Sequence, residues 1–356
     1  MLIFHCGDIH LDAPFAALSR DKAQIRKNEV RSSFASIISA ALEKKADVML
    51  IAGDLFDSPT PSKSAIDFVT TQLNRLSPMP VFISAGNHDY LTYGTYCGCV
   101  ELGEHVHVFK DALENVRLDT LKLNIYGASF TSAESNCLIE NFKAENADGI
   151  NILCIHADIT AQSRYNPVSL PQLTECGINY AALGHLHTSS LQKVNGMLIA
   201  YCGTPNPHGF DEAGAKGYIE VRIDGNAMDA AFFEIPSRRY IVTEMDVSPF
   251  CDNDSLINAL SNIINSRDLY KIVFAGTLRN GFEISVPYIL SRLDYAFFVK
   301  AEDKTRIEID VEALLAEETL RGTFARALKE DIQDNDTLFY EALRIGLDAL
   351  AGRETF

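Results

Sequence analysis

The chain has 356 residues, 47% of them hydrophobic, and a formal net charge of −17. At about 100–200 residues per domain, this length predicts one large domain with a smaller one, or two domains. An acidic chain does not attract phosphate backbones over long range, which disfavours a free-standing DNA-binding protein without excluding one.

The N-terminal stretch MLIFHCGDIH has neither the basic region nor the cleavage site of a signal peptide. No window approaches the roughly 18 consecutive apolar residues of a membrane helix. None of the eight cysteines belongs to a CxxC pair, so we expect reduced, mostly buried thiols, including a structural Cys97-Gly98-Cys99. We therefore expect a soluble, cytoplasmic protein with no membrane partner.

Strands and helices are predicted to alternate over the first 90 residues. Buried strands are expected at 2–6, 46–54 and 80–86, and apolar residues three and four apart predict helices at 22–45 and 62–76. This alternation predicts a mostly parallel sheet with helices on its faces. Four further apolar runs at 122–127, 150–156, 179–184 and 197–202 predict more strands, and a β-meander is expected after residue 215.

The composition changes near residues 235–240. Beyond this point a small α+β domain is expected, with strands at 240–246, 270–276, 281–286 and 294–300 and a helix at 254–265. Two amphipathic helical patterns follow, at 311–330 and 336–351. The predicted domains are 1–235, 236–310 and 311–356. On the last helix the apolar stripe Phe339, Leu343, Leu347 and Leu350 fits either core packing or a partner's groove, and the sequence leaves both open.

Five predicted strands end in polar groups that bind metals. The segments are Gly7-Asp8-Ile9-His10, Gly53-Asp54-Leu55-Phe56-Asp57, Gly86-Asn87-His88-Asp89, His156 and Gly184-His185-Leu186-His187. Ligands gather at the carboxyl ends of parallel strands, so these segments are expected to converge. Because side chains repeat every second residue on an extended segment, Asp8 and His10, and likewise His185 and His187, are each expected to point the same way.

The candidate ligands are histidine, aspartate and asparagine, which suit Mn, Fe or Zn rather than a thiolate-bound metal. The seven are Asp8, His10, Asp54, Asn87, His156, His185 and His187. Seven groups are too many for one ion but fit two ions that share a bridging carboxylate. Paired ions clamp the attacking and leaving oxygens of a displacement at phosphorus, with a bridging hydroxide as the natural nucleophile.

His88 and Asp89 are the candidate catalytic residues. His88 is expected to act on the leaving oxygen as a general acid, and Asp89 to orient its imidazole. His208 either reaches the site or has a role in loop structure. Any one motif is weak, because a buried structural histidine is commoner, but five motifs in this order on strand ends point together to an active site.

The motifs GDIH, GDLFD, GNHD, LCIHAD and GHLH resemble the calcineurin-like metallophosphoesterase superfamily. This resemblance implies a four-layer α/β/β/α sandwich with a smaller α+β capping domain and C-terminal helices. It implies one ion on Asp8, His10, Asp54 and His187 and a second on Asp54, Asn87, His156 and His185, with His88 in the catalytic role. Manganese is the favoured metal, with Fe and Zn as alternatives.

Within that superfamily, DIHLDAPF, GDLFDSPTPS and YCGTPNPHGFDEAGAKGY resemble the SbcD-type bacterial DNA repair exonucleases and their YhaO-like relatives. Tyr90 after GNHD argues against the phosphoprotein phosphatase branch. Asp57 stands where eukaryotic and archaeal relatives carry histidine and the SbcD type carries Asp. Asp57, like His208, is therefore a candidate for supporting a metal ligand or contacting the substrate. The resemblance is strong over about residues 1–235 and covers the rest only in outline.

The resemblance implies a Mn-dependent DNA exonuclease subunit in repair or recombination. It implies two partners, a DNA substrate and an SbcC-like coiled-coil ATPase that binds the C-terminal helices, and it leaves a homodimer open. Two alternatives remain: a phosphodiesterase acting on nucleotides or other small phosphodiesters, and a non-enzymatic recruiting subunit. The complete ligand set argues against the second.

Overall fold

A computed structural model describes residues 1–96, 102–145, 149–160, 162–225, 227–279, 282–307, 309–332 and 336–350. The chain divides into two compact units. The first consists of Met1–Ile241, Ser266–Tyr270 and Ala296–Phe298, and the second consists of Val242–Asn265, Lys271–Tyr295 and Val299–Phe356. Among the described residues, no helix is long and apolar enough to cross a bilayer. The boundaries predicted at 235 and 310 stay a prediction.

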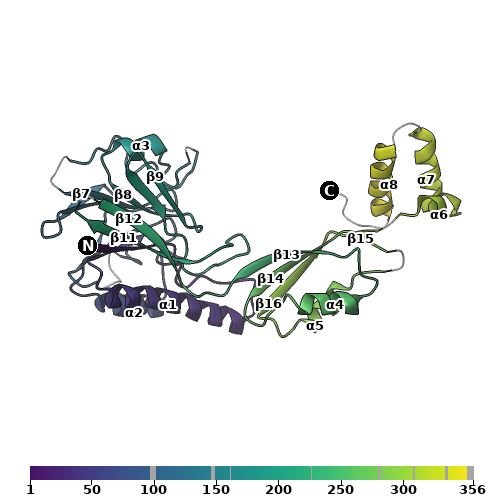
Figure 1. Cartoon of the computed structure of the whole chain (residues 1–356), viewed down its shortest axis with the longest axis horizontal. Coiled ribbons are helices and arrows are strands. Elements are labelled where there is room, and N and C mark those ends of the chain that lie inside the picture. Colours follow the sequence, from purple (N-terminus) through teal and green to yellow (C-terminus); the bar gives the residue numbers. More distant parts are fainter. Residues whose placement is uncertain are drawn as a thin grey trace. The chain divides into compact units, whose positions relative to one another are not determined.

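The first unit contains two six-stranded sheets (Figure 1). One has the order β12-β11-β1-β2-β3-β4, from β1 (Leu2–Cys6), β2 (Val48–Ala52), β3 (Val81–Ser84), β4 (Val106–Val108), β11 (Gly217–Asp224) and β12 (Ala227–Glu234). The other has the order β5-β6-β7-β8-β10-β9, from β5 (Glu114–Leu118), β6 (Leu123–Ala128), β7 (Ile150–His156), β8 (Tyr180–Gly184), β9 (Ser190–Val194) and β10 (Met197–Tyr201). Strands β1, β2 and β3 pair in parallel in the first sheet, as β7 and β8 do in the second.

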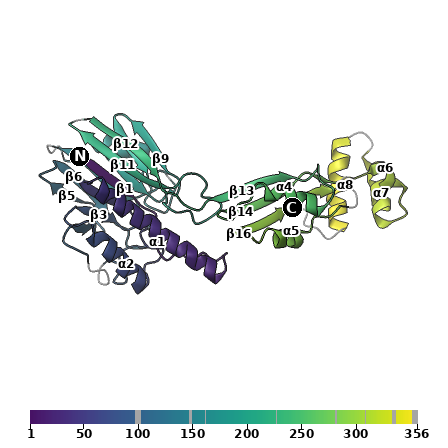
Figure 2. The same cartoon turned by 60° about the horizontal axis from the view of Figure 1, so that its bottom comes forward.

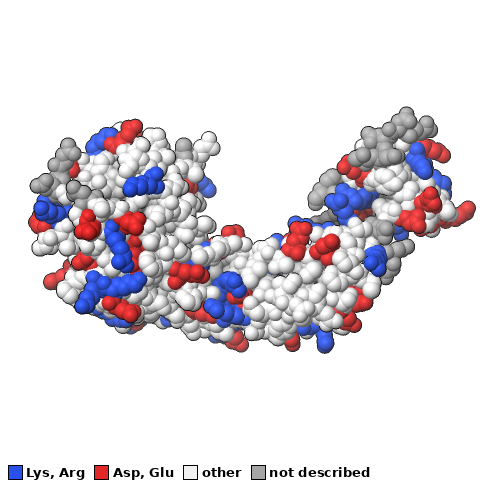
Figure 3. Space-filling model, viewed as in Figure 1, with Lys and Arg blue, Asp and Glu red and all other residues white. Residues whose placement is uncertain are grey.

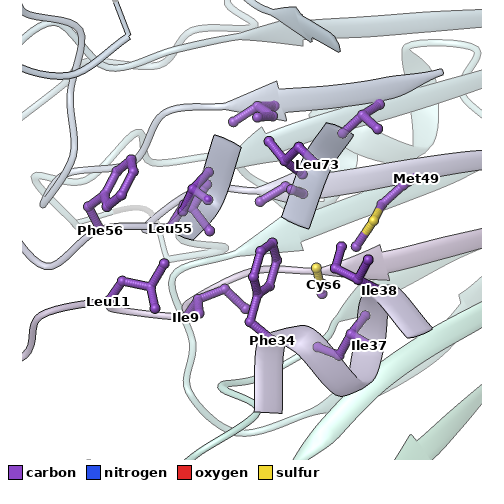
Figure 4. Packing of buried hydrophobic residues seen from close by; sticks show 14 of the residues in the cluster. Cys6, Ile9, Leu11, Phe34, Ile37, Ile38, Met49, Leu55, Phe56 and Leu73 are labelled. Carbon is purple, nitrogen blue, oxygen red and sulfur yellow. The ribbon is translucent and has the colours of Figure 1, made fainter. Parts of the chain in front are cut away.

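Strand β2 shows how the layers form, because its side chains alternate between two cores. Met49 and Ile51 share one core with buried residues of helices α1 (Arg20–Glu43) and α2 (Lys63–Asn74). Figure 4 shows Met49 in this core with Phe34 and Ile38 of α1. The alternate residues of β2 pack in a second core that includes buried residues of β7 and β8. Full burial of such aliphatic and aromatic side chains stabilises the fold by about 1.5–3 kcal/mol each.

A third core lies on the other face of the second sheet, where Leu173 of α3 (Leu170–Glu175) packs. A capping box between Ser169 and Gln172 begins this short helix. The order is therefore helix, sheet, sheet, helix, which confirms the predicted α/β/β/α sandwich.

The C-terminal part has a sheet of order β13-β14-β16 and a pair, β15 with β17. Its elements are β13 (Tyr240–Asp246), α4 (Asn253–Ser261), β14 (Leu269–Ala275), β15 (Thr277–Leu278), α5 (Val286–Arg292), β16 (Phe298–Asp303), β17 (Arg306–Ile307), α6 (Val311–Ala316), α7 (Leu320–Asp331) and α8 (Asp336–Leu350). Helices α7 and α8 lie side by side (Figures 1 and 2).

Several sequence predictions for this part are wrong in detail. The pattern at 311–330 is two helices, because Glu317 leaves the helical conformation and Thr319 caps a new helix through Gly322 N. The strand expected at 281–286 is absent from its described residues, and α5 begins there with Pro287 in its first turn. The strand expected at 294–300 begins only at Phe298.

The apolar stripe of the last helix is mostly core. Phe339, Leu343 and Leu347 are buried with Leu314 and Ala325, whereas Leu350 is exposed. The cysteines among the described residues are free, and most of them are buried. Cys97 and Cys99 lie outside the described residues.

Candidate metal centre

The polar segments after β1, β2, β3, β7 and β8 meet at one place in the first unit. Backbone hydrogen bonds continue from β1 and β2 into the loops, from Asp8 N to Gly53 O (3.0 Å) and from His10 N to Asp54 O (2.9 Å). The second sheet joins through His185 N, which donates to the Asp8 carboxylate at 3.0 Å. The sequence prediction that these strand ends converge is confirmed.

Four of the candidate ligands have left-handed backbone conformations. Asp8, His10 and Asp54 each have φ of 50°, and His185 has φ of 101°. The expectation that the Asp8/His10 and His185/His187 pairs lie on extended segments is therefore wrong. Each such residue costs on the order of 1–3 kcal/mol, and strain of this kind clusters at functional sites.

A first group of donors centres on His10 and His187, whose Nε2 atoms lie 3.0 Å apart. Each ring has a carboxylate behind it, Asp57 at 2.9 Å from His10 Nδ1 and Glu212 at 2.6 Å from His187 Nδ1. Because a carboxylate accepts, each Nδ1 carries the proton, and in the neutral ring each Nε2 presents a lone pair. Two lone pairs facing each other at this distance require a cation or a proton between them.

The pKa shifts of His10 and His187 show which of the two rings can carry a proton when no cation is bound. Burial lowers the pKa of His10 to about 4. Burial acts in the same direction on His187, but the hydrogen bond to Glu212 and the charge of Asp8 outweigh it and raise the pKa of His187 to about 9. A proton on His187 can therefore satisfy the pair, and a metal ion bound to both rings would have to displace it.

A second group of donors centres on His156. Its Nδ1 lies 3.0 Å from Ala52 O, a carbonyl that only accepts, so this nitrogen carries the proton. Burial lowers the pKa of His156, which keeps the ring neutral. The remaining Nε2 faces Asn87 Oδ1 at 2.9 Å and Asp54 Oδ2 at 3.4 Å, so three atoms that can bind a metal converge.

His185 completes the second group. Its ring centroid lies 5.2 Å from that of His156, and its Nε2 lies 3.7 Å from Asp158 Oδ2. Burial lowers the pKa of His185 to about 4, so this ring is also neutral near pH 7. Neutral imidazole is the form of histidine that binds metals.

Asp54 lies between the two groups. Its Oδ2 is 3.7 Å from His10 Nε2 and 3.4 Å from His156 Nε2. Burial, together with the negative charges of Asp89 and Asp8, raises the pKa of Asp54 well above its usual range. Divalent cations would compensate this accumulation of buried acid.

The donor set fits divalent metal ions. It consists of imidazole nitrogens, carboxylate oxygens and an amide oxygen, which suit hard to borderline cations. The buried thiols do not join it, because burial raises the pKa values of Cys6, Cys154 and Cys202. Asp8, His10 and His187, and likewise Asp8, Asp54 and His156, each offer ligand atoms within 4.8 Å of one another.

Asp57, not Asp89, is the carboxylate beside His88. The His88 side chain is 45% exposed, and its Nδ1 lies 3.5 Å from Asp57 Oδ1. Asp89 is fully buried and accepts from the backbone N–H groups of Leu55, Phe56 and Gly86 and from the Tyr96 hydroxyl. The expectation that Asp89 orients the His88 ring is therefore wrong, because its oxygens brace the two loops instead.

His208 lies among the same rings. It stacks on Phe15 with centroids 5.4 Å apart and meets the ring of His10 edge-on at 5.3 Å. Its backbone N–H donates to Glu212 Oε2 at 2.8 Å. Sequence reasoning missed Glu212, although it belongs to the segment after GHLH, because nothing in its spacing from His187 marks it as a partner.

The chain is similar to proteins of one family. The sequence model described as calcineurin-like phosphoesterase matches residues 1–196. YhaO of Bacillus subtilis, an uncharacterized metallophosphoesterase, is 29% identical over 248 residues, 65% of this chain and 60% of that protein. The DNA double-strand break repair protein Mre11 of Aeropyrum pernix is 26% identical over 280 residues, 73% of this chain and 66% of its own. This chain thus spans less than two thirds of either relative.

Among solved structures, an archaeal phosphodiesterase aligns with a TM-score of 0.38 and 12% identity, over 65% of this chain and 100% of that one. The residues matched by the family model are more than half of the chain and include every candidate ligand from Asp8 to His187. The chain belongs to the calcineurin-like phosphoesterase family.

Proposed function

We propose that the chain is a two-metal phosphodiesterase that hydrolyses DNA as an exonuclease subunit in repair or recombination. The observation that carries the hydrolytic part is the convergence of imidazole nitrogens, an amide oxygen and carboxylate oxygens around the buried Asp54. The similarity to Mre11, named a DNA double-strand break repair protein, supports DNA as the substrate.

In this proposal Asp8, His10, Asp54 and His187 hold one cation, and Asp54, Asn87, His156 and His185 hold the other. Manganese is the proposed metal, with iron or zinc as alternatives that fit the same donors. When bound by these residues, two cations would supply a hydroxide nucleophile at neutral pH and would neutralise charge on the phosphate oxygens.

His88 is the proposed general acid. Its ring is the most exposed of the imidazoles in the cluster, and its backbone N–H is fixed by Asp54 Oδ1 at 2.9 Å. Asp57 lies against both His10 Nδ1 and His88 Nδ1, so one carboxylate orients a metal ligand and the proton donor.

His208 is a proposed contact to the substrate phosphate. Its Nε2 is buried and has no hydrogen-bond partner within the described part of the chain, and its Nδ1 lies 3.8 Å from Glu212 Oε2. Leaving buried polar atoms without a partner costs about 1–3 kcal/mol, which a phosphate oxygen or its bound water would recover.

The C-terminal helices are the proposed binding site for an SbcC-like coiled-coil ATPase. On α8, Tyr340, Ile345 and Leu350 are 53%, 42% and 44% exposed. These side chains lie beside the buried residues Phe339, Leu343 and Leu347 and leave apolar surface available to a partner helix. A homodimer is a further proposal that only a measurement of mass in solution tests.

Charge favours a second candidate, hydrolysis of nucleotides or other small phosphodiesters. The net charge is −17, and acidic and basic side chains are interspersed on the face shown in Figure 3 rather than forming a continuous basic surface. Binding of a DNA duplex draws on several cationic contacts, whereas a small diester needs only the metal centre.

The test is hydrolysis by the purified full chain with Mn²⁺ at a stated ionic strength. Substrates are single- and double-stranded DNA, cyclic nucleotides and bis-p-nitrophenyl phosphate. Asp54→Asn should lower every Mn-dependent rate by more than about 100-fold, since even the outer partners of metal ligands are worth 10–100-fold. Asp229→Asn, an exposed carboxylate on β12, is the matched control and should keep full activity.

DNA cleavage lost in Asp54→Asn supports the proposal. Turnover of small diesters alone establishes the second candidate. Hydrolysis of no substrate by the wild-type chain contradicts both, and wild-type rates in Asp54→Asn refute the bridging role of that residue.

A further inference from the structure

Glu212 is a largely buried carboxylate in the loop between β10 and β11. Its side chain is 10% exposed, and each of its oxygens has a different partner. Oε1 accepts from His187 Nδ1 at 2.6 Å, and Oε2 accepts from the backbone N–H of His208 at 2.8 Å. One side chain therefore connects a candidate metal ligand to the segment that carries His208.

The loop is anchored by buried contacts on both sides of Glu212. Before it, the fully buried guanidinium of Arg26 on α1 donates to Asn206 Oδ1 and to Pro207 O, the latter at 2.7 Å. After it, Lys216 Nζ donates to the backbone carbonyl of His187 at 3.0 Å. Glu212 is thus presented to His187 from a fixed backbone.

The two facing imidazoles of the first donor group are supported in the same way. Asp57 stands behind His10 as Glu212 stands behind His187. A carboxylate behind a metal-binding imidazole fixes which nitrogen carries the proton, fixes the ring orientation and raises the basicity of the coordinating nitrogen.

We propose that Glu212 is a positioning residue for the metal centre, which holds His187 with Nε2 directed at the cation shared with His10 and fixes the segment bearing His208. This inference rests on the proposed two-metal function. In this role Glu212 acts through His187 and through the backbone of His208.

Glutamine at this position tests the charge and hydrogen bonds of Glu212 without changing the size of the side chain. An amide has one acceptor oxygen and one donor nitrogen, so Glu212→Gln can accept from His187 or from His208 but not from both. The variant keeps the size of the side chain, loses the negative charge and breaks one of the two contacts. Glu212→Asp keeps the charge but is one methylene shorter.

The experiment is calorimetric titration of Mn²⁺ into the chelator-stripped full chain, with elemental analysis of the loaded protein. Glu212→Gln should weaken one of the two sites by about 10–100-fold, the range found for outer partners of metal ligands. Glu212→Asp should fall between this variant and the wild type. Hydrolysis of bis-p-nitrophenyl phosphate should fall in kcat at low Mn²⁺ and recover with added Mn²⁺, while KM for the diester stays unchanged.

Glu220→Gln is the control. Glu220 is a buried carboxylate on β11 that binds Lys44, Tyr218 and Arg222, none of them a candidate ligand, so this variant should keep the Mn²⁺ affinity of the wild type. Wild-type affinity in folded Glu212→Gln overturns the inference. If that variant does not fold, wild-type affinity in Glu212→Asp overturns it. A wild-type chain that binds no Mn²⁺ and hydrolyses nothing instead contradicts the proposed function.

Discussion

At the scale of single residues, tautomers organise the candidate site. Each of His10, His156 and His187 has one ring nitrogen opposite an oxygen that only accepts. The other nitrogen of each ring points toward Asp54 or toward the facing imidazole, and in the neutral ring it presents a lone pair. Rings oriented in this way need little rearrangement to bind a cation, although His187 must first release a proton.

Replacing His88 tests the division between metal binding and proton transfer. His88→Ala should keep its full metal content by elemental analysis, because the Asp54 carboxylate is fixed through the backbone N–H of residue 88. The rate of DNA hydrolysis should fall by about 10²–10⁴-fold, the usual worth of a general acid. The rate of bis-p-nitrophenyl phosphate hydrolysis should fall by a smaller factor, because p-nitrophenolate is a good leaving group and does not need a proton.

Equal losses on both substrates would argue that His88 does not act on the leaving oxygen. Full activity on DNA would remove its catalytic role altogether. Asp229→Asn again serves as a control with unchanged rates.

Sequence patterns predict the candidate metal ligands better than they predict the carboxylates that support those ligands. Asp8, His10 and Asp54 could be identified because metal binding restricts the residue types and because ligands gather where parallel strands end. The supporting carboxylates could not be assigned in the same way. Asp89 is adjacent to His88 in sequence, yet its side chain turns inward to three backbone N–H groups, whereas Glu212 reaches His187 from a separate loop.

At the scale of elements, glycines set how closely the loops approach. A Cβ on Gly184 at the end of β8 would lie 1.9 Å from Ala52 O at the end of β2, and one on Gly53 would lie 2.3 Å from His156 Nδ1. These contacts join the two sheets at the level of the candidate ligands. Only glycine permits this spacing.

Gly184→Ala should therefore force β8 and β2 apart. Overpacking of this kind costs about 1–3 kcal/mol of the free energy of unfolding, measured by urea denaturation. The folded fraction should also bind less Mn²⁺, because His185 and His156 flank the contact. Gly196→Ala is the control. Gly196 has φ of 88°, and a Cβ there would meet no atom within 4 Å. The free energy of unfolding should therefore fall by about 1 kcal/mol through backbone strain, while Mn²⁺ binding should stay unchanged.

Wild-type Mn²⁺ binding by Gly184→Ala would show that the spacing of the sheets does not position the ligands. The strands themselves could be predicted well, as β7 at Ile150–His156 shows, because a buried run bounded by polar residues has few alternatives. The break between α6 and α7 could not, because Glu317 and Thr319 are compatible with a continuous helical pattern until tertiary packing fixes them.

At the scale of the whole molecule, the residues that the family model matches also contain the candidate metal centre. Every candidate ligand belongs to the first unit and to the residues matched by the family model. The C-terminal helices have a core of their own, with Leu314, Ala325 and Leu343 at its centre. Hydrolysis and partner binding are therefore expected to be separable.

Deleting residues 311–356 should leave Mn-dependent hydrolysis of bis-p-nitrophenyl phosphate unchanged and abolish binding to a purified SbcC-like ATPase in a pull-down. Ile345→Asp in the full chain is a milder variant, because it places a charge on a side chain that is 42% exposed and disturbs no buried residue. It should weaken the same association without lowering the thermal stability of the chain. Retained binding by the deletion variant would place the ATPase contact elsewhere, and lost hydrolysis would show that the metal centre depends on the helices.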